Sequence, residues 1–180
     1  MINDELDECR RRTLGLLAAF DDEFLTAQHS PLMSPLAWDL AHVGNYEDLW
    51  LVRALGHDGV APHLDDLYDA FRHPRRDRPT LPLLSPTDAR AYIEEVRSRA
   101  LSILDDGSAR ADDPRLLDDG FVYGMVIQHE HQHDETMLAT IQLSDVHVDT
   151  DAWGPQAVAI APAKSIAACW PPSSTWPSRA

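Results

Sequence analysis

The chain has 180 residues, a hydrophobic share of 44% and a formal net charge of −15 at pH 7. This length and composition suit one globular domain and exclude a disordered polypeptide. No apolar run is long enough to cross a membrane, and the negative charge disfavours nucleic acid and anionic lipid as partners. Only two cysteines, Cys9 and Cys169, and a polar, acidic start indicate a cytoplasmic protein without a disulfide framework.

Apolar residues at helical spacing predict a first helix from about residue 3 to residue 28. A second helix is expected over 34–56. Its start has Ser34 as the expected N-cap and Pro35 at the first helical position. Gly56 is a good C-terminal stop. Both segments are long enough to span a small bundle.

A long crossover is expected over 57–84, with a short helix at about 64–71. Connections of this length are usually functional rather than mere connectors. A third helix is predicted from Pro86 to the Asp-Asp-Gly sequence at 105–107. A fourth begins near residue 113 and is expected to loosen at Gly120.

Four amphipathic helices with one long crossover predict an all-α four-helix bundle over residues 1–143, because no convincing strand pattern occurs there. The composition changes after Leu143. Residues 144–180 hold three of the five tryptophans, the only lysine and no glutamate. Without periodicity or caps, this segment is predicted to be a poorly ordered tail without a recognisable domain. The abrupt change also fits a hypothetical shift of reading frame near codon 144.

The sequence His-Glu-His-Gln-His at 129–133 is the strongest chemical signal in the chain. His129 and His133 are four residues apart in a segment that reads as helix. Their imidazoles therefore lie one turn apart on one face and can bind one ion. Imidazole is a common ligand for zinc, iron and copper. His131 is two residues from each and points elsewhere.

His42 is the best candidate for a third ligand, because two side chains rarely hold a catalytic ion. It shares a predicted helix face with large neighbours that point inward: Trp38, Asn45, Tyr46 and Leu49. Taken alone, His42 is more simply read as a buried, hydrogen-bonded core residue. Beside the pair on the fourth helix, the ligand interpretation is favoured.

The same sequence also matches the HExxH signature of zinc proteases, in which the glutamate is the general base. The extended form of that signature requires a glycine and a third histidine further on. Thr136 and Ala139 occupy those positions, and no glutamate follows Glu135. The protease interpretation is therefore disfavoured.

Arginines cluster in the crossover, with four of them within seven residues: Arg72, Arg75, Arg76 and Arg78. The planar guanidinium group suits carboxylate recognition. In a strongly acidic chain such a cluster either binds an anionic ligand or balances local carboxylates. Solvated charges are the ordinary alternative.

Three segments together carry a family resemblance: 34–51, 67–78 and 128–143. Through them, residues 1–143 resemble the N-terminal DinB-like domain of the bacterial ergothioneine-biosynthesis sulfoxide synthases, also called hercynine oxygenases. The resemblance implies a mononuclear non-haem iron(II) held by His42, His129 and His133. It also implies that O₂, hercynine and either γ-glutamylcysteine or cysteine are the substrates, joined at sulfur as a sulfoxide.

The resemblance also implies roles for three residues in substrate binding. Gln132 would hydrogen-bond the imidazole of hercynine, and Arg75 and Arg78 would hold carboxylates of the thiol substrate. We expect both guanidinium groups at the mouth of the histidine site. An amide on a helix surface and solvated charges are the ordinary alternatives for these residues.

Members of this family continue into a second domain that resembles the formylglycine-generating enzymes and supplies a catalytic tyrosine. Residues 144–180 do not resemble its beginning, so we expect a truncated chain that binds metal and turns over feebly. Two alternatives stay open. One is a stand-alone DinB-like thiol transferase with zinc on the same histidines. The other is a non-catalytic metal-binding remnant.

Overall fold

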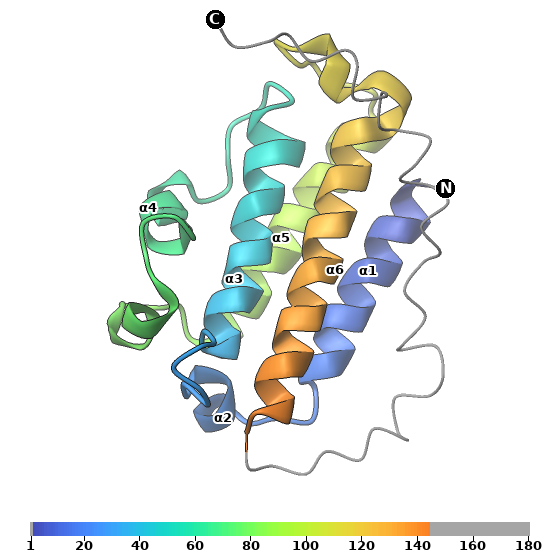
Figure 1. Ribbon diagram of the computed structural model, residues 1–180. Helices are drawn as coiled ribbons and strands as arrows, with labels where there is room; N and C mark the ends of the chain where they lie inside the picture. Colours follow the sequence, from blue (N-terminus) through green and yellow to red (C-terminus); the bar gives the residue numbers. More distant parts are fainter. Residues whose placement is uncertain (1, 145–180) are drawn as a thin grey trace, which may run out of the picture. The chain divides into compact units, whose positions relative to one another are not determined.

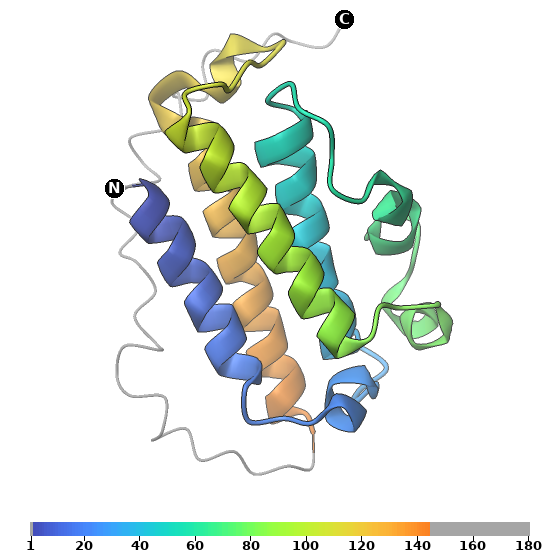
Figure 2. The same cartoon turned by 180° about the vertical axis from the view of Figure 1, so that it is seen from behind.

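The computed structural model describes residues 2–144, in which all regular elements are helices and no strand occurs. Four long helices form a bundle (Figure 1, Figure 2): α1 (Ile2–Leu17), α3 (Leu36–Glu47), α5 (Pro86–Asp105) and α6 (Phe121–Gln142). Helix α3 packs against α5 and α6, and α1 packs against α6. The predicted all-α bundle is confirmed. The predicted tail lies, apart from Ser144, outside the described residues.

Helices α3 and α5 run in the same direction, so the crossover between them returns along the length of the bundle (Figure 1). Within residues 2–144, no helix is both long enough and apolar enough to cross a membrane. Several shorter helical elements complete the described chain: α2 (Asp22–Thr26), η1 (Asp48–Arg53), η2 (Pro62–Leu64), α4 (Asp65–Tyr68), η3 (Arg75–Thr80), η4 (Pro114–Leu116) and η5 (Asp118–Gly120).

The first helix is shorter than predicted. It ends at Leu17, and α2 begins after a break. The side chain of Asp21 accepts a hydrogen bond from the backbone N–H of Phe24, at 2.9 Å, and so caps the new helix. Aspartate competes with a continuous helix in this way because its carboxylate binds nearby backbone donors. The stacked rings of Phe20 and Phe24 had extended the apolar pattern across the break.

The second helix begins close to the expected residue, but Ser34 is not its N-cap. Pro35 is the N-cap residue, and no side chain caps this end. The Ser34 hydroxyl instead accepts a hydrogen bond from Arg78, at 2.6 Å. Beyond α3 the helix widens into the π-helix η1 and stops before Gly56, whose φ is +88°. This widening breaks the regular spacing, and Leu49, expected to face inward, is exposed.

The third helix follows the prediction closely, whereas the fourth, expected from near residue 113, begins at Phe121. Ser85 caps α5 by accepting a hydrogen bond from the backbone N–H of Asp88. The helix ends at Asp105. Short 3₁₀ turns, η4 and η5, precede α6. The chain bends at Asp119 and Gly120, which both have positive φ, and this is where loosening was expected.

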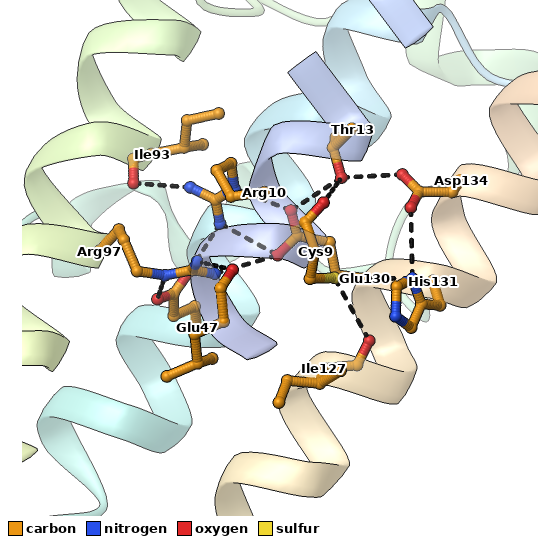
Figure 3. A network of polar contacts seen from close by, with 11 residues as sticks. Cys9, Arg10, Thr13, Glu47, Ile93, Arg97, Ile127, Glu130, His131 and Asp134 are labelled. Carbon is orange, nitrogen blue, oxygen red and sulfur yellow. Dashed lines mark hydrogen bonds and ion pairs between the residues drawn. The ribbon is translucent and has the colours of Figure 1, made fainter. Parts of the chain in front are cut away.

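Four buried charged side chains meet in the middle of the bundle, one from each long helix (Figure 3). Arg10 of α1 binds Glu130 of α6 at 2.8 Å and Glu47 of α3 at 2.6 Å. Arg97 of α5 binds the same two carboxylates, at 3.2 Å and 2.6 Å. Each arginine also donates to a backbone carbonyl. Two arginines face two glutamates, so the network is charge-balanced, and it connects all four long helices.

The network keeps its charges despite burial. Burial alone raises the pKa of Glu130, but the Arg10 and Arg97 guanidinium groups outweigh it and hold that pKa below its ordinary value. The Thr13 hydroxyl adds a further hydrogen bond to Glu130, at 2.8 Å. Removing one partner from such a network leaves an uncompensated buried charge, which costs several kcal/mol.

Replacing Arg10 by methionine is therefore expected to lower the free energy of unfolding by about 3–5 kcal/mol, because Glu47 and Glu130 then share a single arginine. The neighbouring Arg11 is a matched control, since it pairs with Glu8 at the exposed surface of the same helix. Arg11→Met should change the stability by less than about 1 kcal/mol. Urea unfolding followed by circular dichroism measures both, and equal losses would contradict the assignment.

Candidate metal centre

Three histidines converge from two helices. His42 comes from α3, and His129 and His133 come from α6. Their ring centroids lie 4.6 to 5.1 Å apart. One nitrogen from each ring lies within 4.8 Å of the other two. The structure thus brings together the three residues singled out by spacing, in an arrangement that can hold one ion.

Two of the rings are oriented by acceptors outside the trio. Nδ1 of His42 lies 2.7 Å from the backbone carbonyl oxygen of Tyr68, and Nδ1 of His133 lies 2.9 Å from a carboxylate oxygen of Asp39. A carbonyl oxygen only accepts, so Nδ1 of His42 carries the proton and Nε2 is left with a lone pair. The carboxylate does the same for His133. Such partners are characteristic of metal-binding histidines.

The third ring is held by stacking. His129 lies flat against Tyr46, with the ring centroids 3.7 Å apart and the planes 10° from parallel. Both residues are only partly buried. This ring therefore has its plane fixed by packing while its edge stays directed toward the other two histidines.

His42 and His129 are neutral at physiological pH, because the pKa of each lies well below that value. Burial, aided by the neighbouring His133, lowers the pKa of His42 to about 4. Burial, His133 and His42 together lower the pKa of His129 to about 3. A neutral imidazole has the free lone pair that a metal ion needs. The site is thus prepared for a cation without prior loss of a proton.

Asp39 gives the site its negative charge. Its side chain is buried, and Oδ2 has no hydrogen-bond partner among the described residues. A buried unpaired carboxylate oxygen is costly unless a positive charge lies near it. A divalent cation held by the three histidines supplies that charge. The donor set and its surroundings therefore fit a metal ion.

Arg78 supports the site from the side of the crossover. Its guanidinium carbon lies 3.4 Å from the centroid of a Trp38 ring, and Trp38 in turn stacks on His42 at 4.6 Å. Arg78 is buried and donates hydrogen bonds to Ser34 and to backbone carbonyls of the crossover. The Arg78 guanidinium was expected at the mouth of the histidine site, within reach of a substrate, but it is buried.

Arg75 and Gln132 are both exposed. One guanidinium nitrogen of Arg75 donates to the carbonyl of Leu32 at 3.1 Å, and the rest of the group faces outward. Gln132 lies on α6 one turn after His129. Both side chains are accessible to a small molecule from solution.

The glutamate of the protease-like signature faces away from the histidines. Glu130 lies in the core network with Arg10 and Arg97 (Figure 3). It is therefore in no position to activate a water molecule on an ion held by His129 and His133. This geometry removes the zinc protease alternative.

Sequence reasoning missed the residues that orient the histidines. Asp39 stands three positions before His42 in a largely apolar helix, and this isolated carboxylate was the available signal. The carbonyl of Tyr68 carried no signal, because any residue has one. Tyr46 was placed on the correct face, but its contact with His129 depends on how α3 and α6 pack.

Helical bundles of this kind commonly build metal sites from side chains on facing helices. The family model described as the DinB superfamily matches residues 5–137. The chain therefore belongs to the DinB superfamily.

Curated relatives extend this result. A hercynine oxygenase of Mycolicibacterium smegmatis is 52% identical over 145 residues, which are 79% of this chain and 32% of the relative. A hercynine oxygenase of Mycobacterium tuberculosis is 51% identical over 141 residues, or 77% of this chain and 31% of the relative. The resemblance found in the sequence is confirmed. The chain spans about a third of the length of these relatives.

Replacing His42 by alanine is expected to abolish the binding of a divalent metal by the histidine trio, because only two of its ligands remain. Asp39→Asn should weaken binding by about 10- to 100-fold, since it removes the charge that orients His133. His63, which is exposed in the crossover, provides the control, and His63→Ala should bind like the parent chain. Isothermal titration with Zn²⁺ and Co²⁺ measures all three. Unchanged binding by His42→Ala would exclude the trio.

The metal-free chain is expected to lose stability as the pH falls below about 6.5. The folded-state pKa values of His42 and His129, about 4 and about 3, lie below the ordinary value of 6.5. In this window the unfolded chain binds more protons, so acid favours unfolding. The variant carrying His42→Gln and His129→Gln should show a smaller loss between about pH 7 and about pH 5. Urea unfolding at both values tests this, with His63→Gln as control; equal slopes would contradict it.

Proposed function

We propose that residues 1–143 are the metal-binding DinB-like domain of a hercynine oxygenase and that the resident ion is iron(II). The observation that carries the proposal is the trio of converging histidines in a chain about half identical to hercynine oxygenases over the matched residues. Two cysteines in the whole sequence suit a reducing, cytoplasmic setting.

The proposed reaction joins the sulfur of γ-glutamylcysteine, or of cysteine, to the imidazole C2 of hercynine. The C2–H and S–H bonds break and a C–S bond forms. One oxygen atom of O₂ becomes the sulfoxide oxygen, and the other leaves as water with the two hydrogens. Iron(II) on three histidines supplies redox chemistry with O₂ and open coordination positions.

The protein's own groups hold the site and position the substrates. Tyr68 and Asp39 fix the proton of each ring on Nδ1, so the Nε2 atoms of His42 and His133 remain ligands. Gln132 is proposed to hydrogen-bond the imidazole of hercynine, since its exposed amide lies one turn from His129. Such positioning brings two substrates together in one geometry, which accounts for much of the rate of bimolecular reactions.

The arginines of the crossover are proposed to receive the carboxylates of the thiol. Arg75 is exposed and has donors to spare, so it suits direct contact. Arg78 donates to Ser34 and to the backbone of the crossover. Arg78 is proposed to contribute a positive charge beside the site and to support the Trp38 ring. To contact a substrate carboxylate directly, its guanidinium would have to give up one of these hydrogen bonds.

His129 and His133 are partly exposed, so the site is reachable from solution although His42 is buried. Two hollows on the described surface, of about 800 Å³ and about 510 Å³, are lined by other residues, mainly of α5 and α1. An open three-histidine surface is consistent with a pocket completed by a second domain of the family. In this proposal that domain also supplies the catalytic tyrosine, and residues 1–143 supply the metal ligands.

Anaerobic titration tests the substrate part of the proposal. Addition of γ-glutamylcysteine to the iron(II)-loaded chain is expected to change the metal's spectrum, because sulfur enters an open position. Arg75→Ala should weaken the response by about tenfold, by loss of one charge-assisted contact. Arg76→Ala is the matched control, since Arg76 is exposed in the same turn. Equal weakening in both variants would show that Arg75 is an ordinary solvent-exposed charge without a role in substrate binding.

Turnover separates the proposal from its alternatives. The iron-loaded 180-residue chain, given hercynine, γ-glutamylcysteine and O₂, is expected to form sulfoxide slowly compared with a two-domain hercynine oxygenase, as measured by mass spectrometry. A zinc-loaded chain that transfers a thiol without O₂ would instead favour the thiol transferase, for which three histidines and an open position are equally suitable. Metal binding without any response to substrates would favour the non-catalytic remnant.

A further inference from the structure

A second group of potential ligands lies on the opposite flank of α6, between α6 and α1 (Figure 3). It consists of Cys9 of α1 and of His131 and Asp134 of α6. Their ligand atoms all lie within 4.8 Å of one another. None of the three belongs to the histidine trio, and the proposed oxygenase chemistry uses none of them.

The distances match the edges of a zinc coordination tetrahedron. Sγ of Cys9 lies 3.7 Å from Nδ1 of His131, and the same nitrogen lies 3.5 Å from Oδ2 of Asp134. Ordinary bond lengths, about 2.3 Å for Zn–S and about 2.0–2.2 Å for Zn–N and Zn–O, give edges of about 3.6 Å and about 3.4 Å. These two distances fit the tetrahedron, and the third pair, Cys9 and Asp134, also lies within 4.8 Å, so the three donors can surround one ion.

Neighbouring groups orient these donors as an outer shell would. The Thr13 hydroxyl lies 2.8 Å from Oδ1 of Asp134 and shares its single proton between this oxygen and Glu130, while Oδ2 of Asp134 faces His131. The Cys9 side chain is fully buried, and its thiol donates weakly to the carbonyl of Ile127 at 3.7 Å. His131 is partly exposed, so a water molecule has access to a fourth position.

The local charge favours a cation. Burial raises the pKa of the Cys9 thiol, and the negative charges of Glu130 and Asp134 raise it further. Arg97 and Arg10 oppose this effect and offset Glu130, so Asp134 is the carboxylate that attracts a positive ion, which then displaces the thiol proton. A thiolate, an imidazole and a carboxylate together select zinc or a similar borderline ion over magnesium or calcium, which prefer oxygen ligands.

We infer that Cys9, His131 and Asp134 form a second metal site, a zinc site that links α1 to α6. Its role is structural, because its ligands come from two neighbouring helices and Cys9 is fully buried between them. Zinc in this position binds only the folded chain and therefore stabilises it. The inference stands independently of the ion and reaction proposed for the histidine trio.

Cobalt(II) distinguishes the two sites, because thiolate ligation gives an intense sulfur-to-cobalt charge-transfer band that imidazoles do not give. The full chain, reduced and freed of metal with a chelator, is expected to bind two equivalents of Co²⁺, one of them with this band. Cys9→Ser should lose the band and one equivalent. Cys169→Ser, which changes the other cysteine of the sequence, is the matched control and should keep both.

Two further variants complete the test. The triple variant His42→Ala, His129→Ala, His133→Ala should lose one equivalent but keep the charge-transfer band. Asp134→Asn preserves the volume of the side chain and should weaken the cobalt affinity of the banded site at least about tenfold. If circular dichroism shows Cys9→Ser to be unfolded, Asp134→Asn tests the second metal site in its place. Absence of the band in the parent chain, its loss in Cys169→Ser, or unchanged affinity in Asp134→Asn would overturn the inference.

Discussion

Four charges buried among apolar side chains determine how each long helix is rotated about its own axis. Arg10, Glu47, Arg97 and Glu130 come from four different helices, and each carboxylate binds both arginines. Taking such ions out of water costs several kcal/mol apiece, and only complete pairing offsets that cost. A rotation of any one helix would leave a charge unpaired in the core. Apolar contacts are less directional than these ion pairs, so the network constrains the helix rotations more closely than the apolar packing does.

The rotation of α6 then determines where its chemistry lies. Successive residues of an α-helix are about 100° apart around the axis. With Glu130 fixed toward the core, His129 and His133 fall on the flank that faces α3, beside His42. His131 and Asp134 fall on the flank that faces α1, beside Cys9. A single buried glutamate thus divides one histidine-rich segment into two separate groups of candidate ligands.

Local patterns were sufficient for much of this structure. The spacing of His129 and His133 predicted a shared face, and apolar periodicity predicted four long helices. The core network was not predicted, although its signal exists: Arg10 stands in the apolar stripe between Leu6 and Leu17, and the other three charged residues occupy similar positions in their helices. A charge in such a stripe identifies no partner by itself, because pairing depends on how the helices pack. The end of the first helix was predicted wrongly for a related reason. A single carboxylate such as Asp21 can interrupt a helix by capping the next one.

The crossover is part of the candidate metal centre rather than a connection beside it. His42 receives its orientation from two crossover residues, the carbonyl of Tyr68 and, through Trp38, the guanidinium of Arg78. The ligands on α6 depend instead on the bundle, because Asp39 of α3 orients His133. The trio therefore forms only when the bundle and the crossover are both in place. If the crossover moved away, His42 would lose the acceptor that keeps its proton on Nδ1, and with it the defined lone pair on Nε2. The length of this connection, unusual for a mere link between two helices, follows from that requirement.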